Sequence, residues 1–178
     1  MHSVLTLQTP RLSDYGELVQ VWEDSVRATH DFLPDCYIVL LREQVLLSGN
    51  GLRLDFADGQ RVELEPPFQR SRFSGERELL ATPVDGPVQA FNLIWRPSVL
   101  EVELLHRPLV GGMFCFADAD TAWALHLLGG CARIDGDEGS HELAGGDSAW
   151  LASARRRRFA IEGAGEALLM RVTRADGA

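Results

Sequence analysis

The sequence has few of the side chains that bind transition metals. It contains five histidines, and none lies between Leu46 and Leu105. Its three cysteines, Cys36, Cys115 and Cys131, are far apart and form no CxxC pair. Structural zinc sites and disulfide frameworks need closely spaced or evenly numbered cysteines. We therefore expect reduced thiols, no metal site and no cofactor.

Two further features that the sequence lacks argue against membranes and nucleic acids as binding partners. No apolar run approaches the length of a membrane-spanning helix, and the N-terminus lacks the basic-then-apolar pattern of a signal peptide. The formal net charge is −9, from 26 acidic and 17 basic residues, whereas nucleic-acid binding needs a basic surface. We expect a cytoplasmic protein that binds neither nucleic acid nor membrane.

From Leu46 onward the sequence predicts short strands separated by tight turns. The chain has 178 residues, of which 46% are hydrophobic and 24% charged, enough for one domain or two small modules. Residues 52–56 alternate with period two, and Ala57-Asp58-Gly59 turns the chain into residues 61–64. Further strands are expected at residues 68–73, 78–83, 88–95, 123–128, 131–134, 141–143, 149–151, 158–161 and 167–172.

The first 45 residues have a different pattern. Residues 3–7 predict a short strand, and a helix is expected from Tyr15 to Thr29 because apolar residues recur at helical spacing. A second helix is expected to begin near Pro34 and to place Leu41 and Val45 on one stripe. The segment RLSDYGELVQVWEDSVRATH, with the residues after it, resembles the start of a GNAT-family acetyltransferase. The glycine-rich acetyl-CoA loop of that family does not follow, so we expect residues 1–45 to be a packed helical cap.

The remainder of the chain contains a repeat. VLLSGNGLRLDFADG, which begins at Val45, aligns with LHLLGGCARIDGDEG, which begins at Leu125, at an offset of about 80 residues. The segments AFNLIWR and ALLMRVTR fall at equivalent places. The repeat predicts two similar β units, residues 46–105 and residues 106–178.

The order of strands and turns is similar to the cupin plan, and two copies would make a bicupin. GLRLDF, PPFQRSRFSG and above all DGPVQAFNLI resemble the HutD/Ves family over residues 46–177. The resemblance implies a mainly β fold of two double-stranded β-helix barrels, here with an N-terminal two-helix appendage. It also implies a role in histidine utilisation, such as sensing formylated glutamate or urocanate. The chain lacks the W-(K/R)-N-G-G-G segment of the family and has Ala90 where the family has an acid.

Asn92 is the first candidate site residue. It interrupts the apolar strand expected at residues 88–95, and a buried carboxamide must be hydrogen-bonded or face a polar cavity. Arg70 and Arg72 of QRSRF offer guanidinium groups, which bind carboxylates in bidentate fashion. With Asp85 of the preceding turn they form our predicted ligand-binding set, a polar pocket for a small carboxylate in the first barrel. Whether Asn92 lines a pocket or is structural stays open.

Other reactive side chains give weaker signals. His126 and His141 are expected on different strands, without the spacing of a metal site. Cys115 has no base nearby in the sequence and fits a buried inert thiol. The arginine run 155–158 fits either a solvated barrel rim or a clamp for a dicarboxylate.

The sequence therefore favours a small-molecule-binding or regulatory protein over an enzyme. Two alternatives remain at this stage. One is an acetyl-CoA-dependent acetyltransferase, which depends on the first 45 residues. The other is a purely structural or oligomerisation protein, since cupin-like sheets often pair and a homodimer is then expected.

Overall fold

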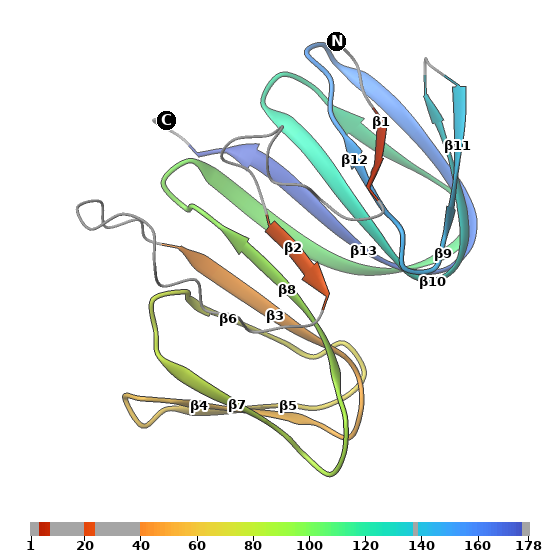
Figure 1. The fold of residues 1–178 in the computed structure, drawn as a ribbon. Helices are drawn as coiled ribbons and strands as arrows, with labels where there is room; N and C mark the ends of the chain where they lie inside the picture. The colour runs from red at the N-terminus through yellow and green to blue at the C-terminus, as the bar shows by residue number, and fades with distance from the viewer. Residues whose placement is uncertain (1–3, 8–19, 24–39, 137–138, 176–178) are drawn as a thin grey trace. The chain divides into compact units, whose positions relative to one another are not determined.

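A computed structural model describes residues 4–7, 20–23, 40–136 and 139–175 (Figure 1). These residues form strands and turns and no helix, so the prediction of a mainly β protein is confirmed. No helix in the described part is long and apolar enough to cross a membrane. The strands are β1 (Val4–Leu7), β2 (Gln20–Glu23), β3 (Leu41–Ser48), β4 (Leu52–Phe56), β5 (Arg61–Leu64), β6 (Arg70–Ser74), β7 (Leu79–Pro83), β8 (Gln89–Trp95), β9 (Leu100–Ala117), β10 (Thr121–Gly136), β11 (Gly139–Ala144), β12 (Ser148–Leu151) and β13 (Arg157–Arg174).

The chain divides into two compact units. Unit 1 comprises Met1–Pro10 and Val99–Ala178, and unit 2 comprises Arg11–Ser98. The unit boundary at residues 98 and 99 differs from the expected one, because residues 105 and 106 lie inside the continuous strand β9. The expected boundary after residue 45 lies inside β3 in the same way.

Unit 2 contains two antiparallel sheets. One has the order β2-β8-β3-β6 and the other the order β5-β4-β7 (Figure 1). Apolar side chains from both sheets form one core, in which the rings of Phe56 and Phe73 meet edge to face with centroids 5.2 Å apart. Leu46, Leu54 and Leu64 are fully buried in the same core. One face of the β3–β8 sheet is thus directed toward the smaller sheet.

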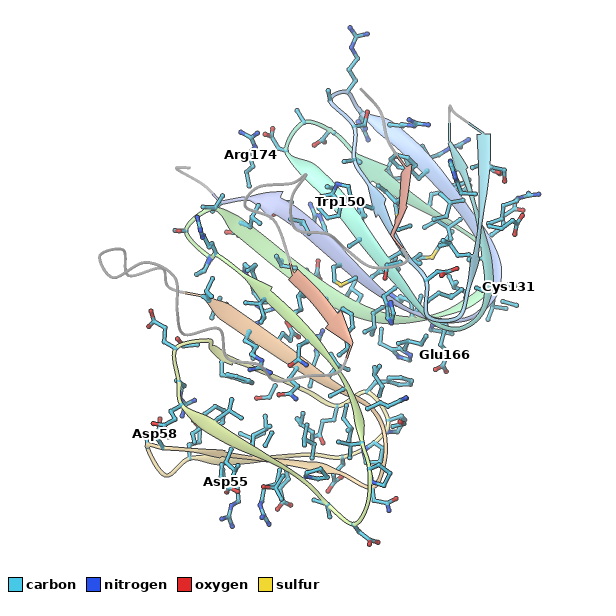
Figure 2. All side chains as sticks on the ribbon, in the orientation of Figure 1. Asp55, Asp58, Cys131, Trp150, Glu166 and Arg174 are labelled. Atoms are coloured by element: carbon cyan, nitrogen blue, oxygen red, sulfur yellow. The ribbon has the colours of Figure 1, made fainter. Side chains whose placement is uncertain are left out.

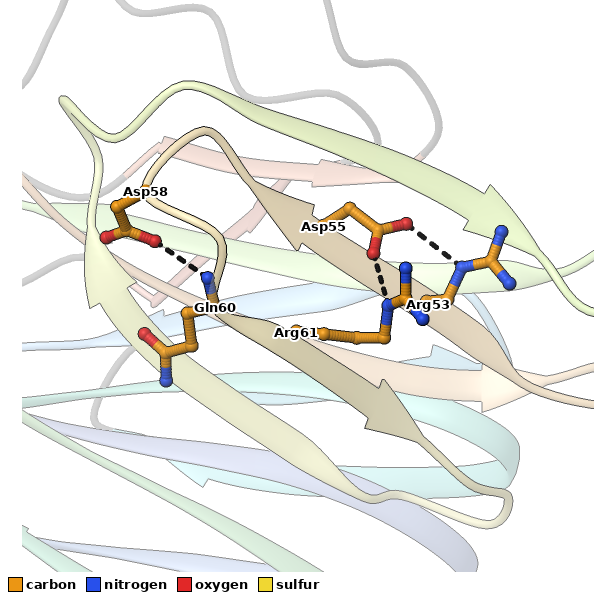
Figure 3. Close-up of polar contacts among 5 residues, drawn as sticks. All are labelled: Arg53, Asp55, Asp58, Gln60 and Arg61. Atoms are coloured by element: carbon orange, nitrogen blue, oxygen red, sulfur yellow. Dashed lines mark hydrogen bonds and ion pairs between the residues drawn. The ribbon is translucent and has the colours of Figure 1, made fainter.

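The period-two alternation expected for residues 52–56 places the charged side chains of β4 on its outer face. Asp55 accepts hydrogen bonds from Arg53 (3.0 Å) and Arg61 (2.5 Å), as Figure 3 shows. In the turn, Asp58 accepts a hydrogen bond from the backbone N–H of Gln60 at 3.0 Å. The hydrogen bond from Arg61 is the main cause that lowers the pKa of Asp55, since it stabilises the carboxylate.

We predict that Asp55 makes the stability of the protein depend on acid pH. A carboxyl with a lowered folded-state pKa contributes stability above its unfolded pKa of about 3.9, and this is lost as the pH falls through the folded value. Asp55→Asn should therefore lower the melting temperature at pH 7, and the difference from wild type should vanish toward pH 2. Glu78→Gln, on an exposed carboxylate outside this network, is the control. A difference that stays constant from pH 7 to pH 2 contradicts the assignment.

Unit 1 is built on one sheet with the order β1-β12-β10-β13-β9, and β11 pairs with β10. Its core is apolar and includes Leu125, Ile134, Phe159, Ile161 and Leu169. β10 and β13 run without interruption where the sequence predicts two strands each, with a register shift between Leu127 and Gly129. At this point the backbones of β10 and β13 approach so closely that only glycine fits at residue 165, because a Cβ there would lie 2.0 Å from the carbonyl oxygen of Gly129.

The N-terminal expectations are only partly met. The strand expected at residues 3–7 is found as β1. The expected helices are wrong where the structure describes them, since residues 20–23 form β2 and residues 41–48 form β3. β2 pairs with β8, and β3 pairs with β6 and β8, so sheet pairing overrides the helical periodicity. The remaining residues of both expected helices lie outside the described part of the chain.

Candidate functional site

Strands β3 and β8 bring three polar side chains together on the inner face of the larger sheet of unit 2. Gln44 pairs directly with Asn92, and Arg42 lies two residues before Gln44 on the same face. Arg42 donates two hydrogen bonds to Asn92 Oδ1, from Nε at 3.1 Å and from Nη2 at 2.7 Å. Gln44 and Asn92 are only 3% and 8% exposed. We call Arg42, Gln44 and Asn92 the β3–β8 polar cluster.

Arg42 lies in the cluster without an opposite charge. No carboxylate forms an ion pair with it among the residues that the structure describes, and its guanidinium lies 5.7 Å from the centroid of the Phe73 ring. Burial lowers the pKa of Arg42, yet a guanidinium remains protonated in proteins. A partly buried cation whose acceptor is a neutral amide oxygen is well suited to bind an anion.

Gln44 supplies a second unsatisfied group. Its Oε1 atom is buried and accepts no hydrogen bond within the described part of the chain. A buried polar atom without a partner costs about 1–3 kcal/mol, and native structures contain few of them. The side-chain amide of Gln44 therefore offers a polar position that a bound molecule can satisfy.

The opposite face of the same sheet carries a different group. Glu43 is buried and lies 3.3 Å from Arg70 Nη1 and 2.7 Å from Arg72 Nη2. The Arg72 guanidinium lies 5.0 Å from the centroid of the Trp95 ring. This group thus forms a complete ion-pair network around a buried carboxylate.

The structure does not bring the four predicted site residues together. Arg70 pairs with Val45, one residue beyond Gln44, so Arg70 and Arg72 lie on the sheet face opposite to Asn92. Asp85 lies in an exposed turn with a φ of 51°, where its backbone oxygen accepts a hydrogen bond from Asn50. Ligand binding by these residues stays a prediction. The sequence pattern missed Arg42 and Gln44 because it placed them in a helix.

Unit 1 holds the remaining reactive side chains. His126 and His141 lie on β10 and β11, and His126 Nδ1 is 2.9 Å from Ser148 Oγ. No group of three or more metal-ligating side chains occurs in the described residues. Burial raises the pKa of the Cys115 thiol to about 11, whereas Cys131 is exposed beside the bend of the sheet, near Glu166 (Figure 2). Little thiolate forms at Cys115 near neutral pH.

The comparisons with solved structures show a cupin-like fold. The chain is 24% identical to a conserved protein of unknown function from Pseudomonas aeruginosa, with a TM-score of 0.61 over 75% of this chain and 70% of that one. It is 18% identical to HutD from Pseudomonas fluorescens, with a TM-score of 0.61 over 76% and 69% of the two chains. Quercetin 2,3-dioxygenase from Acinetobacter baumannii matches at 15% identity, with a TM-score of 0.55 over 76% and 60%.

The family follows from the sequence itself. The HutD family model matches residues 38–169, and the chain belongs to the HutD family. This confirms the HutD part of the expected resemblance. The resemblance of the first 45 residues to an acetyltransferase is not supported, since β2 and β3 form where that family would have helices. No curated protein matches the chain.

Proposed function

We propose that the protein binds a small carboxylate at the β3–β8 polar cluster. The observation that carries the proposal is that Arg42 and Gln44 lie on one face of the sheet and that each has a polar group without a complementary partner. Arg42 has no countercharge and Gln44 Oε1 has no donor within the described residues. A carboxylate would satisfy Arg42 in bidentate fashion, and a polar group of the same ligand would satisfy Gln44.

The chemistry of the cluster supports binding over catalysis. A guanidinium and two carboxamides can orient and neutralise an anion, but none of them exchanges a proton readily near neutral pH. A general acid–base catalyst needs a group that titrates near the working pH. We therefore propose a sensor or regulatory protein of histidine utilisation, with formylated glutamate or urocanate as the first compounds to test.

The pair Arg70 and Arg72 is a less favourable position for the ligand. Both guanidinium groups already lie within ion-pair distance of Glu43. An added carboxylate would have to compete with this buried acid, at the cost of leaving Glu43 less well paired. We therefore place the ligand at Arg42, with Asp85 outside the contact set.

Gln44→Met tests the proposal with two readouts that move in opposite directions. Methionine keeps the length of the side chain and removes the unpaired oxygen, so the free energy of unfolding should stay unchanged or rise. Affinity for the ligand should fall at least tenfold, because one hydrogen bond to it is lost. The measurement is calorimetric titration and thermal unfolding with formylated glutamate, urocanate, glutamate and acetyl-CoA.

Arg72→Met is the matched control, since it removes a guanidinium from the other face of the sheet. It should lower stability and leave ligand affinity within twofold of wild type. Equal affinities of wild type and Gln44→Met for a carboxylate would contradict the assignment of the site. A wild-type protein that responds to acetyl-CoA alone would contradict the function itself.

A further inference from the structure

The arginine run 155–158, for which the sequence left two interpretations open, divides between the two faces of the sheet of unit 1. Arg158 pairs with Phe116 across β13 and β9, and directly paired residues lie on the same face of a sheet. Phe116 is 50% exposed, so this is the outer face. Arg157 pairs with Ala117, which is completely buried, so its side chain begins on the inner face.

On the outer face, two guanidinium groups lie over exposed aromatic rings. The Arg156 guanidinium is 5.9 Å from the centroid of the Phe116 ring, and that of Arg158 is 4.7 Å from the centroid of the Phe114 ring. The cation–π contact restrains each arginine side chain. Because long side chains otherwise lose rotamer entropy when they are ordered at an interface, such restraint lowers the cost of binding a partner.

These two arginines have no countercharge. No carboxylate forms an ion pair with Arg156 or Arg158 among the residues that the structure describes, although the chain has a formal net charge of −9. On the same face of the sheet, by contrast, Arg133 Nη2 lies 2.8 Å from Glu162 Oε2. Restrained guanidinium groups without a carboxylate partner are suited to bind the carboxylates of another molecule.

The same face of β9 also exposes a row of large apolar side chains. Val110, Phe114 and Phe116 are 88%, 56% and 50% exposed. They lie on one side of the strand because their spacing is even and the register with β13 is continuous. Exposed apolar patches with a polar rim mark interaction sites. We call Val110, Phe114, Phe116, Arg156 and Arg158 the β9 outer patch.

We propose that the β9 outer patch binds an acidic segment of another protein, in which apolar side chains accompany the carboxylates. The carboxylates of the segment pair with Arg156 and Arg158, each of which can accept a bidentate partner. The apolar side chains of the segment cover Val110 and the two phenylalanine rings and remove them from water. Charge and apolar surface thus both select the partner.

A planar anionic membrane fits this face less well than a narrow segment does. Glu162 of β13 lies directly beside β9, opposite Gly112, and Glu142 lies further along the same row on β11. Both carboxylate side chains are exposed. A membrane surface would have to approach these acids together with the arginines, whereas a single segment can follow β9 alone.

Single-stranded nucleic acid is also a less suitable partner. Bases bind to such proteins by stacking on the open faces of aromatic rings. In the β9 outer patch the guanidinium groups already lie over the Phe114 and Phe116 rings. The arrangement therefore favours carboxylates with apolar neighbours over bases.

Fluorescence anisotropy with a labelled short peptide of alternating aspartate and leucine tests the proposal. Wild type should bind it with a dissociation constant of about 10–100 µM, as expected for a small interface. Arg156→Gln combined with Arg158→Gln should weaken binding at least tenfold. Arg171→Gln combined with Arg174→Gln removes two exposed arginines from another part of β13 and is the matched control. A wild type that does not bind overturns the proposal, and so does equal loss of affinity in the two double variants.

The apolar part of the patch is tested separately. Phe116→Ser should also weaken binding of the peptide at least tenfold, and an oligoglutamate of the same length should bind wild type at least tenfold more weakly. Equal binding of oligoglutamate would show that charge alone is recognised and would overturn the proposal. Gln44→Met should keep wild-type affinity for the peptide, and a loss there would place the peptide at the β3–β8 polar cluster instead.

Two further probes test the class of partner. Vesicles that contain phosphatidylserine and a labelled oligothymidine should each bind wild type more weakly than the aspartate–leucine peptide does. Tighter binding of either one, with the same loss in the double variant of Arg156 and Arg158, would assign the patch to a membrane or to nucleic acid and would overturn the proposed partner.

Discussion

Replacing Asn92 with leucine is expected to lower the free energy of unfolding by about 2–3 kcal/mol. The Arg42 guanidinium would lose both hydrogen bonds to Asn92 Oδ1, at 3.1 and 2.7 Å, while it remains partly buried. Hydrogen bonds to charged groups contribute about 1.5–3 kcal/mol, and an unsatisfied charge adds to the loss. Urea unfolding at pH 7 measures the effect.

Asn92→Asp is expected to have a different outcome. It keeps the acceptor and gives Arg42 the countercharge that the described residues lack, so the protein should fold with at least wild-type stability. It should also abolish carboxylate binding, because the added negative charge neutralises Arg42 and repels the ligand. Gln89→Glu adds the same charge at an exposed position of β8 and should leave binding unchanged. If Asn92→Asp destabilises the protein as strongly as leucine does, the role given to Arg42 is wrong.

Phe159→Ala should have the largest effect on stability, a loss of about 3–5 kcal/mol. Phe159 is completely buried in the core of unit 1, and its replacement leaves a cavity among Ile134, Ile161 and their neighbours. Phe114→Ala is the matched control, since Phe114 lies on the adjacent strand with its side chain on the outer face. It should lower stability by no more than about 1 kcal/mol, through loss of the contact between its ring and the Arg158 guanidinium. Comparable losses in the two variants would contradict the assigned faces of β9 and β13.

The sequence was most informative where strands are short and bounded by turns. Residues 52–56 and 61–64 are strands with the expected ends, because strict alternation and the Asp58-Gly59 turn together allow only one placement of the two strands. The aligned segments of the repeat also behave alike. Arg53 pairs with Asp55 at 3.0 Å in unit 2, and Arg133 pairs with Asp135 at 3.5 Å in unit 1.

The errors have two physical causes. The apolar spacing of residues 15–29 fits a helix, but residues 20–23 satisfy their backbone groups against β8, a partner that local periodicity cannot reveal. β9 was not predicted because its proline and paired glycines are typical of a loop. Within long, bent strands such residues instead allow an edge or a change of direction.

Only one residue of the β3–β8 polar cluster could be predicted from the sequence, for a related reason. Asn92 was found because a carboxamide in an apolar strand needs a partner. The partners Arg42 and Gln44 come from β3, which the helical pattern concealed. Arg70 and Arg72 were grouped with Asn92 because only the strand register, with Gln44 opposite Asn92 and Val45 opposite Arg70, separates the two faces.

The most direct test of the carboxylate site is the side-chain amide signal of Gln44 in a nitrogen–proton correlation spectrum. The signal is assigned by its absence from Gln44→Met. Titration with formylated glutamate or urocanate should shift this signal and that of Asn92 together and saturably, with the same midpoint that calorimetry gives. Binding that leaves both amide signals unmoved would contradict a carboxylate site at Arg42, Gln44 and Asn92.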